Sequence, residues 1–523
     1  MTVTSQSAKS AGPARRGARP LTTYSLVVLL TAAASIAWVF LTPLGSVPDE
    51  PSHVQYAAAV VRGQTGTSSD GVVTIPNGII TGTYRASCTG FAPLATTRCQ
   101  STIAPDSTPM PVPNPSAGYP PLYFVIVGLP TLTGFDATTW YVMRLLSVTI
   151  GIGLLAAFIP VSRRYPPGWL VTGMLLAVTP MATYMLGSVN PNGAEIIAGL
   201  ATTVGIGLLM VASRAGDPVG FVRTATPTAL ALSYLILARP RSYLLAAGLA
   251  AVALILMPRG TASLVAGSRR ALAARVAVPA AALVAAVTFD TLSRRPSGND
   301  QLPLNMGVVL RTAASLIDDW VIEMVGIFGW RDFRPPIGLA FAWLAGIAAI
   351  AVMAMAAAHW RGRVGLAVLV IGGTVIAPVF VLLTVFRDGA GYQGRYQMPL
   401  TVGIPVLAAA ILATSDVRPR DLGSRVAGWA PWGAAVIYLL VWGGSVLRYS
   451  VGLPIPSLGQ VSQVWTWWLN PWGTALVVAS ASAFAACTAL VSIRIRALSA
   501  WSDSAKPGQP EDEPVSGTSD VSV

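Results

Sequence analysis

Residues Leu21–Leu41 read LTTYSLVVLLTAAASIAWVFL, and this apolar run decides the fold of the 523-residue chain. It carries no charge and is long enough to cross the hydrocarbon core of a bilayer as a helix. Lys9, Arg15, Arg16 and Arg19 precede it. The run therefore predicts a membrane anchor that starts in the cytoplasm, and it is too long and too poorly terminated for a cleaved signal peptide.

The composition extends this prediction to the whole chain. Hydrophobic residues make up 53% and charged residues 11% of the sequence, and the mean hydropathy is +0.62. These values exclude a soluble globular protein of this length. The apolar segments are long and continuous, whereas an outer-membrane barrel would show short alternating strands. The fold class is thus an all-α, polytopic transmembrane helix bundle.

Clusters of Lys and Arg set the direction of each crossing, because cytoplasmic loops are enriched in them. This rule predicts about twelve spans with both termini in the cytoplasm. Two of these helices form a tight pair that is separated by a break at Arg239-Pro240-Arg241. The net charge of +13 largely reflects this enrichment of Lys and Arg in the predicted cytoplasmic loops. It therefore does not indicate a nucleic-acid partner. The predicted spans are Leu21–Leu41, Trp140–Pro160, Trp169–Leu186, Ala194–Ala212, two helices within Thr226–Met257, Val276–Leu292, Ile337–Ala358, Val364–Phe386, Met398–Thr414, Trp429–Leu447 and Trp472–Ile493.

The domain organisation follows from these spans. Residues 21–498 form one transmembrane domain with a large first extracytoplasmic loop, 42–139, and the polar ends 1–20 and 499–523 are predicted to be disordered cytoplasmic tails. Cys88 and Cys99 fall in the large loop, where an oxidising compartment could pair them, whereas Cys487 lies alone in an apolar segment. With two histidines in the chain, we expect no multi-histidine metal site. The predicted location is the cytoplasmic membrane.

The polar residues that could carry chemistry all fall in the predicted outer loops. A transporter would instead place such residues near the bilayer midplane, so the one-sided distribution favours an enzyme acting at the outer leaflet. The candidates are Asp49, Glu50, His53, Tyr119, Asn190, Arg239, Arg241, Asp318, Asp319, Glu323, Trp330, Arg331, Tyr392, Gln393, Arg395 and Tyr396.

Asp49 is the candidate for general base, with Glu50 beside it, because a carboxylate can take a proton from an acceptor hydroxyl. Arginine binds phosphate with paired donors, which makes Arg395 the first candidate for an anion site. Arg239, Arg241 and Arg331 are further candidates.

Each candidate also has a purely structural interpretation. Asp49-Glu50 could cap a helix that begins near Pro51, and Glu50 with His53 could form a structural pair, orient Asp49 or bind a divalent cation such as Mg²⁺ or Mn²⁺. Arg395 could be an interfacial residue beside a span. Asn190 could cap the turn between two spans, Trp330 could be a packing residue, and Asp318-Asp319 could lie on a solvated helix face.

Several motifs occur one after another along the chain. They are PDEPSH (48–53), YPPLYF (119–124) before Arg144-Leu145-Leu146-Ser147, SVNPNGAE (188–195), FGWRD (328–332) and YQGRYQMPL (392–400). This order resembles the family called domain of unknown function 2142, over roughly residues 40–400. That family is similar in layout to the GT-C glycosyltransferases, which use polyprenyl-phosphate sugars. The GT-C pattern often has a histidine where this chain has Tyr119, so no role for that histidine carries over.

The resemblance implies a GT-C-like, inverting glycosyltransferase. It would move a sugar from a polyprenyl-phosphate donor to an extracytoplasmic cell-envelope glycan, in contact with membrane lipids. The Ala-, Gly- and Arg-rich composition is typical of a high-GC bacterium, which favours an actinobacterial wall polysaccharide. Two alternatives remain at this point: a transporter or flippase of lipid-linked glycans, and a non-catalytic scaffold of envelope assembly, for which Asp49 would be dispensable.

Overall fold

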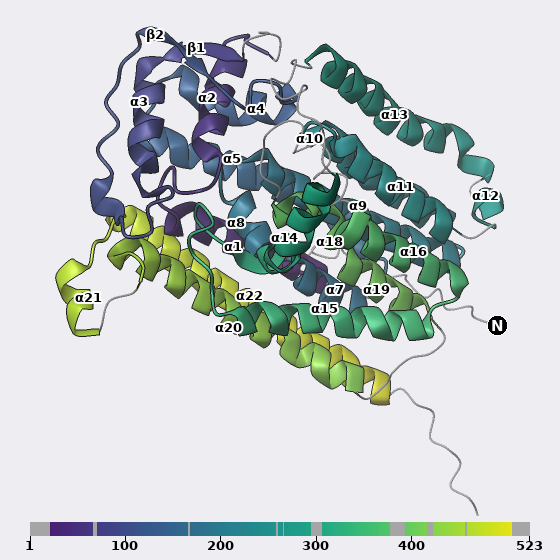
Figure 1. Cartoon of the computed structure of the whole chain (residues 1–523). Helices are drawn as coiled ribbons and strands as arrows, with labels where there is room; N and C mark the ends of the chain where they lie inside the picture. The colour runs from purple at the N-terminus through teal and green to yellow at the C-terminus, as the bar shows by residue number, and fades with distance from the viewer. Residues whose placement is uncertain are drawn as a thin grey trace, which may run out of the picture.

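The computed structural model is an elongated bundle of helices with a smaller folded region at one corner (Figure 1). It describes residues 21–65, 71–165, 168–257, 260–264, 266–293, 306–376, 393–415, 422–454 and 458–504. The predicted N-terminal tail lies outside these ranges. The last helix continues to Ser504, past the predicted start of the C-terminal tail at residue 499, and the rest of that tail is outside the described residues.

Nine helices within the described ranges are long and apolar enough to cross a membrane. They confirm an all-α polytopic bundle. These spans are α1 (Thr23–Leu41), α5 (Ala137–Ala156) with α6 (Ile159–Ser162), α9 (Pro191–Arg214), α10 (Pro218–Ala238), η4 (Ala266–Ser268) with α13 (Arg269–Leu292), α15 (Ile337–Ala357), η6 (Gly394–Gln397) with α18 (Met398–Thr401) and α19 (Gly403–Thr414), α20 (Leu422–Val451) and α22 (Pro471–Ser504).

The other three predicted spans correspond to shorter helices. Trp169–Leu186 divides into α7 (Gly168–Ala177) and α8 (Pro180–Leu186), because Thr179 caps a new helix whose first residue is a proline. The second helix of the predicted pair is α11 (Ser242–Leu256), so the chain does break at Arg239-Pro240-Arg241. The span at Val364–Phe386 begins in α16 (Trp360–Ile371) and η5 (Gly372–Ile376), and its remainder lies outside the described residues.

The first loop is a compact unit with helices and a two-stranded sheet. The strands β1 (Val72–Pro76) and β2 (Pro109–Pro113) pair antiparallel, with Val72 opposite Pro113 and Pro76 opposite Pro109. Around them lie α2 (Glu50–Val60), α3 (Asn77–Ala86), η1 (Ser87–Thr89), η2 (Thr97–Cys99), α4 (Pro121–Gly128) and η3 (Leu129–Leu132). In Figure 1 this unit lies away from α12 (Thr261–Leu264), which belongs to a predicted cytoplasmic loop.

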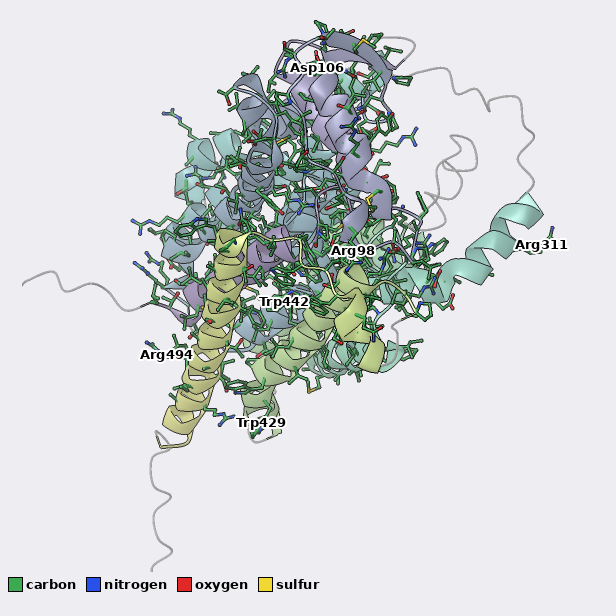
Figure 2. All side chains as sticks on the ribbon, turned by 90° about the vertical axis from the view of Figure 1, so that its left-hand side faces the viewer. Arg98, Asp106, Arg311, Trp429, Trp442 and Arg494 are labelled. Atoms are coloured by element: carbon green, nitrogen blue, oxygen red, sulfur yellow. A yellow bond between two sulfur atoms is a disulfide. The ribbon has the colours of Figure 1, made fainter. Side chains whose placement is uncertain are left out.

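Two further helices lie between predicted spans. They are α14 (Met306–Gly326) and α21 (Leu458–Val464). Figure 2 shows the Arg311 end of α14 projecting from the body of the molecule. It also shows α20, which carries Trp429 and Trp442, and α22, which carries Arg494.

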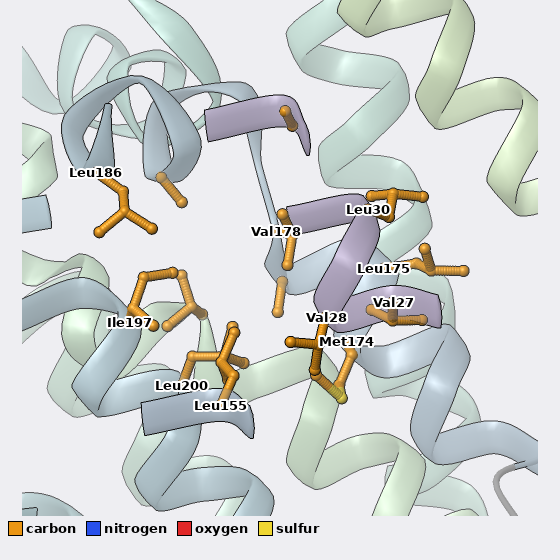
Figure 3. Close-up of a cluster of buried hydrophobic side chains, with 14 of the residues drawn as sticks. Val27, Val28, Leu30, Leu155, Met174, Leu175, Val178, Leu186, Ile197 and Leu200 are labelled. Atoms are coloured by element: carbon orange, nitrogen blue, oxygen red, sulfur yellow. The ribbon is translucent and has the colours of Figure 1, made fainter. Parts of the chain in front are cut away.

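The core forms around α1, α9 and the 394–414 span. In α1 and α9, 83% and 89% of the span is buried, whereas in α13 the buried share is 11%, so α13 belongs to the periphery. Figure 3 shows Val27, Val28 and Leu30 of α1 among side chains of α5, α7, α8 and α9. Since lipid is as apolar as these side chains, close packing rather than water exclusion must hold such helices together.

Gly199 illustrates this close packing. A Cβ at this position of α9 would lie 2.1 Å from the carbonyl oxygen of Pro399 in α18. Only glycine lets the two backbones approach so closely, as small residues do at helix contacts in membranes. The contact places the start of the 394–414 span against α9, near the loop ends that carry the candidate residues.

Candidate functional site

The PDEPSH motif forms the turn between α1 and α2. Asp49 adopts a left-handed backbone conformation with φ of 66° at the N-cap position of α2, and Pro51 lies in the first turn. Within the described part of the chain, its side chain makes no capping hydrogen bond. The carboxylate is therefore free to point elsewhere, which argues against capping as its purpose.

That carboxylate contacts Arg395, which lies far away in sequence. A guanidinium nitrogen of Arg395 donates to Oδ2 of Asp49 at 2.6 Å. The Asp49 side chain is 45% exposed, whereas Arg395 is 2% exposed. Arg395 also has a buried Nε for which the described residues provide no hydrogen-bond partner. An exposed carboxylate and a buried cation with a spare donor thus lie side by side.

Gly394 explains the position of Arg395 in η6. A Cβ at residue 394 would lie 2.1 Å from the carbonyl oxygen of Trp320 in α14, so a side chain there would push the turn away. The Gly394 N–H donates to Oε2 of Glu323 at 2.6 Å. Burial raises the pKa of Glu323, although Arg395 and Arg331 act in the opposite direction. Glu323 therefore fastens the QGRY turn to α14.

Arg239 also lies close to the Tyr396 ring. Its guanidinium carbon lies 4.6 Å from the centroid of that ring, while that of Arg395 lies 5.3 Å from the same centroid. Arg239 also approaches the ring of Tyr119, at 5.9 Å. Two cations on one aromatic ring, with a second ring nearby, form a positively charged aromatic cluster.

Glu195 of α9 holds Arg239 in this position. Its Oε2 accepts a hydrogen bond from Arg239 at 3.0 Å and one from Asn192 at 2.9 Å, and its Oε1 accepts one from Ser242 at 2.5 Å. Burial works against the charge of Arg239, but Glu195, Tyr119 and Tyr396 together raise its pKa above the ordinary value. Arg239 is thus a permanent cation anchored to α9.

His53 is a buried neighbour of the cluster. Its Nδ1 lies 3.0 Å from the hydroxyl of Ser116, and its ring packs near Tyr119 and Phe124. Burial, aided by the charges of Arg239 and Arg395, lowers the pKa of His53 to about 3, against the opposing effect of Asp49. The imidazole is therefore neutral at ordinary pH, and its neighbours suit a positioning role.

Glu50 does not join this cluster, contrary to its predicted catalytic role. It is fully buried and forms a two-point ion pair with Arg144, at 2.7 and 2.6 Å. Its Oε1 also accepts the backbone N–H of Val189 at 3.0 Å. With both oxygens engaged by α5 and the turn before α9, Glu50 has a structural role and does not share a ligand site with His53.

Other predicted residues lie at the edges of the cluster or elsewhere. Asn190 caps α9 by accepting the Asn192 N–H, and it donates to the Pro48 carbonyl at 3.2 Å, as the structural interpretation predicted. Arg241 adopts φ of 65° in the turn before α11. The side-chain oxygen of Gln393 is buried without a partner among the described residues. Tyr392 lies outside them.

The FGWRD motif joins the first loop to the rest of the molecule. Trp330 donates to the Gly45 carbonyl at 3.2 Å and packs against Phe91, which fits the packing interpretation. Arg331 pairs with Asp319 at 3.3 Å and lies 3.8 Å from Glu323. Asp332 accepts two hydrogen bonds from Arg448 of α20, at 3.1 and 2.6 Å.

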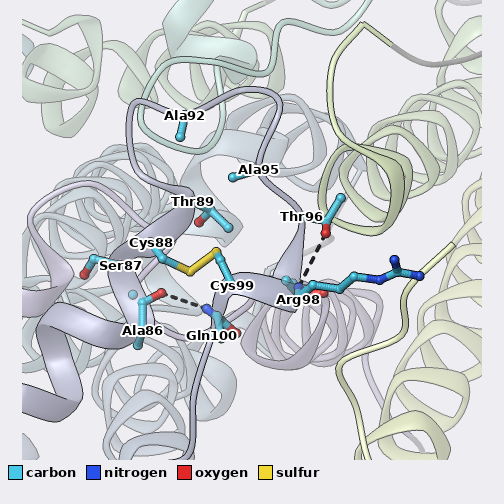
Figure 4. Close-up of a disulfide and its surroundings, with 12 residues drawn as sticks. Ala86, Ser87, Cys88, Thr89, Ala92, Ala95, Thr96, Arg98, Cys99 and Gln100 are labelled. Atoms are coloured by element: carbon cyan, nitrogen blue, oxygen red, sulfur yellow. Dashed lines mark hydrogen bonds between the residues drawn. A yellow bond between two sulfur atoms is a disulfide. The ribbon is translucent and has the colours of Figure 1, made fainter. Parts of the chain in front are cut away.

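The loop cysteines form a disulfide. Cys88 and Cys99 are joined with their Cα atoms 6.0 Å apart (Figure 4). The side chain of Gln100 donates to the carbonyls of Ala86 and Leu44, both at 2.8 Å, so the bridge lies close to the end of α1. Cys487 is a free cysteine on α22.

Three buried charged residues are absent from the sequence-predicted candidates: Arg144, Glu195 and Arg448. Glu195 holds Arg239 in the cluster, whereas Arg144 and Arg448 pair with Glu50 and Asp332 outside it. Each is an ionisable residue within or beside an apolar segment, where such residues are costly and usually have a purpose. Arg144 and Glu195 even fall inside motifs that the sequence singled out. A charged residue inside an apolar run was the signal, and its partner could be identified only from the fold.

These features define a class: a polytopic, all-α membrane protein in which turns far apart in sequence meet at one end of the bundle. The profile of the family described as predicted membrane protein (DUF2142) matches residues 33–404. The chain belongs to this family. No curated protein and no solved structure matches this chain.

Proposed function

We propose that this protein is an integral membrane glycosyltransferase that transfers a sugar from a polyprenyl-phosphate donor to a cell-envelope glycan on the extracytoplasmic side. One observation carries the proposal: the exposed carboxylate of Asp49 lies 2.6 Å from the buried guanidinium of Arg395. A proton acceptor and a phosphate-binding cation are the two groups that this reaction requires.

The reaction assigns a role to each group. Asp49 takes the proton of the acceptor hydroxyl, whose oxygen attacks the anomeric carbon of the donor sugar. The bond from that carbon to the phosphate oxygen breaks, and its electron pair leaves with the polyprenyl phosphate. Arg395, whose Nε has no partner among the described residues, and Arg239 hold the departing anion. A single displacement of this kind inverts the anomeric centre.

The aromatic rings supply the remaining surface. Tyr119 and Tyr396 lie beside the two arginines, and tyrosine rings suit both sugar faces and the polar boundary of a membrane. Glu195 and Glu323 act as positioning residues, since each is buried and holds Arg239 or the Gly394 turn.

The donor set does not suit a divalent cation. Asp49 offers one carboxylate, because Glu50 is engaged by Arg144. Within the ranges that the structure describes, no three His, Cys, Asp or Glu side chains gather in a way that could hold a metal. The proposed step is therefore derived without Mg²⁺ or Mn²⁺.

The orientation is part of the proposal. The disulfide between Cys88 and Cys99 supports an oxidising compartment for the first loop, and the basic residues before α1 support a cytoplasmic N-terminus. The cluster would then face the outside of the cytoplasmic membrane, where lipid-linked donor and glycan acceptor can both reach it.

Sugar transfer in membranes from a deletion strain tests the proposal. The strain is complemented with wild type, Asp49→Asn or Asp318→Asn, and the membranes receive a panel of radiolabelled polyprenyl-phosphate sugars. Loss of the general base should slow the transfer by about 10²- to 10⁴-fold. Asp318 is an exposed aspartate of α14, so its Asn variant serves as the matched control and should keep wild-type activity.

Two results would overturn the proposal. If wild-type membranes consume none of the donors, the protein does not use this class of substrate. If Asp49→Asn transfers sugar as fast as Asp318→Asn, Asp49 is not the base, and a scaffold or transporter becomes the better interpretation.

A further inference from the structure

The loop between Cys88 and Cys99 is held against the end of the membrane-spanning helix α20. Arg448, near the end of α20, donates hydrogen bonds to the carbonyls of Thr89, Ala92 and Ala95 at 3.3, 3.1 and 2.7 Å. The N–H of Leu453 donates to the Pro93 carbonyl at 2.8 Å. With the disulfide closing its base (Figure 4), the loop has fixed contacts at both ends and in the middle.

This rigid loop exposes large apolar side chains. Phe91 is 78% exposed and Leu94 is 75% exposed. Phe91 also has φ of 55°, a conformation that is uncommon for a bulky residue. Its ring packs against that of Trp330, with centroids 4.9 Å apart and the two planes tilted by 51°. The fold therefore fixes these side chains at the surface instead of burying them.

Exposed tryptophans lie on the adjacent segment that leads into α22. The hydroxyl of Thr97 lies 3.3 Å from that of Thr466, which joins the loop to this segment. Trp465 and Trp467 stack with centroids 6.4 Å apart, and Trp472, in the first turn of α22, is 80% exposed. A shallow surface depression lined mainly by apolar atoms extends from Trp467 to Ala479 of α22.

We propose that Phe91 and Leu94, together with Trp465, Trp467 and Trp472, form an interfacial anchor that sits in the boundary between headgroups and acyl chains of the bilayer. The occupant is lipid because the patch continues into the membrane-spanning surface of α22. Tryptophan is enriched at that boundary, and an exposed apolar patch marks a membrane or partner contact.

The charge beside the patch suits the same partner. Arg98, labelled in Figure 2, is exposed within the disulfide loop. A basic side chain at headgroup level attracts lipid phosphates. The anchor would fix the depth of the first loop in the membrane, and the contact of Trp330 joins this loop to the FGWRD motif. The proposed anchor does not depend on the chemistry at Asp49.

Spin labels in nanodiscs test the depth of the loop. In a Cys487→Ala background, nitroxides are attached to Phe91→Cys, Leu94→Cys or Met110→Cys, and their collision rates with oxygen and with a nickel chelate are compared. Met110 is an exposed apolar residue of β2 and provides the control. We expect labels at 91 and 94 to favour oxygen and the label at 110 to favour the nickel chelate. Equal, water-like values at all three positions would overturn the anchor.

A second measurement leaves every native side chain in place, so that disulfide exchange with a new cysteine cannot confuse the result. The wild-type protein is placed in vesicles of phosphatidylcholine and phosphatidylglycerol with a diazirine in the acyl chain, then irradiated, reduced and digested with trypsin. Lipid adducts on the peptide Ala86–Arg98 support the anchor. Adducts on α22 without any on this peptide would show that the loop does not meet lipid, as expected if a protein partner covers it.

Discussion

Asp49 and Glu50 are adjacent in sequence but occupy different environments. The left-handed backbone at Asp49 directs one carboxylate toward Arg395, while α2 begins at Glu50 and directs the next into a buried pair with Arg144. Removing one partner of a buried ion pair leaves an uncompensated charge, which costs more than the loss of a surface pair.

Glu50→Gln should therefore destabilise the protein strongly. Arg144 would stay buried without its carboxylate, at a cost of about 3–5 kcal/mol. Thermal unfolding in detergent measures this as a lower midpoint. Arg334→Gln is the control, because Arg334 is 56% exposed in its pair with Asp319 and such pairs contribute at most about 1 kcal/mol. Equal midpoints for the two variants would contradict the structural role of Glu50.

His53 predicts a pH dependence of stability. Its pKa is about 3 in the folded protein and about 6.5 in an unfolded chain, so the unfolded state binds the extra proton between these values. The contribution of His53 to the free energy of unfolding is fully present above pH 6.5. It falls by up to about 1.4 kcal/mol per pH unit as the pH drops toward 3.

The measurement compares unfolding midpoints of wild type and His53→Gln across this range. Carboxylates titrate in both proteins, so the difference between the two curves isolates the histidine. The wild-type curve should fall more steeply below pH 6.5. Parallel curves would mean that His53 is not held neutral by burial.

At the residue scale, sequence predicted the candidates better than their partners. Asp49 and Arg395 could be selected because each is a charged residue beside a Pro or Gly turn next to an apolar run. Their contact could not be predicted, because the two residues lie 346 positions apart in the sequence. The pair formed by Glu50 and Arg144 was missed for the same reason, at 94 positions.

Helix packing at the level of elements depends on a few glycines. Gly199→Ala should destabilise the bundle, because its Cβ would lie 2.1 Å from the Pro399 carbonyl oxygen and would push α18 from α9. Overpacking of this kind typically costs about 1–3 kcal/mol.

The matched control is Gly153→Ala. Gly153 lies in α5, and a Cβ there would meet none of the described atoms within 4 Å. This substitution should be neutral or slightly stabilising, since alanine favours helix more than glycine does. Unfolding midpoints of both variants and wild type make the comparison. A Gly199→Ala midpoint equal to that of Gly153→Ala would show that α9 and α18 are packed less tightly.

Elements that depend on local signals were predictable. The break at Arg239-Pro240-Arg241 followed from a proline between basic residues, and the structure ends α10 at Ala238 and begins α11 at Ser242. The fold of the first loop was not predictable, because its strands β1 and β2 pair across the residues that separate Pro76 from Pro109. The loop also contacts a distant segment, as Trp330 does with Gly45.

The arrangement of the whole molecule predicts which segments face the outside. A cysteine introduced at Ser107, exposed in the first loop, should react in intact cells with a maleimide that cannot cross membranes. A cysteine at Ser263, exposed in α12, should react only after the cells are broken. Labelling in a Cys487→Ala background measures both. The opposite pattern would invert the orientation and remove the cluster from the extracytoplasmic side.

The all-α polytopic class could be predicted at this scale because apolar length is a local property. Of the twelve predicted spans, nine correspond to helices of the described ranges that are long and apolar enough to cross a membrane. The contacts between the spans could not be predicted, because the residues that form them do not recur at a regular spacing along the sequence. The convergence of PDEPSH, NPNGAE and QGRY on one cluster is a property of the assembled bundle.

The contacts of Glu50 also constrain how the protein is made. Glu50 leaves the ribosome early, but its partners Arg144 and Val189 follow 94 and 139 positions later. The first loop therefore cannot complete its buried contacts until α5 and α9 have been inserted. During that interval the Glu50 carboxylate stays hydrated, and Cys88 and Cys99, which lie only 11 positions apart, can meet before the loop has reached its final position.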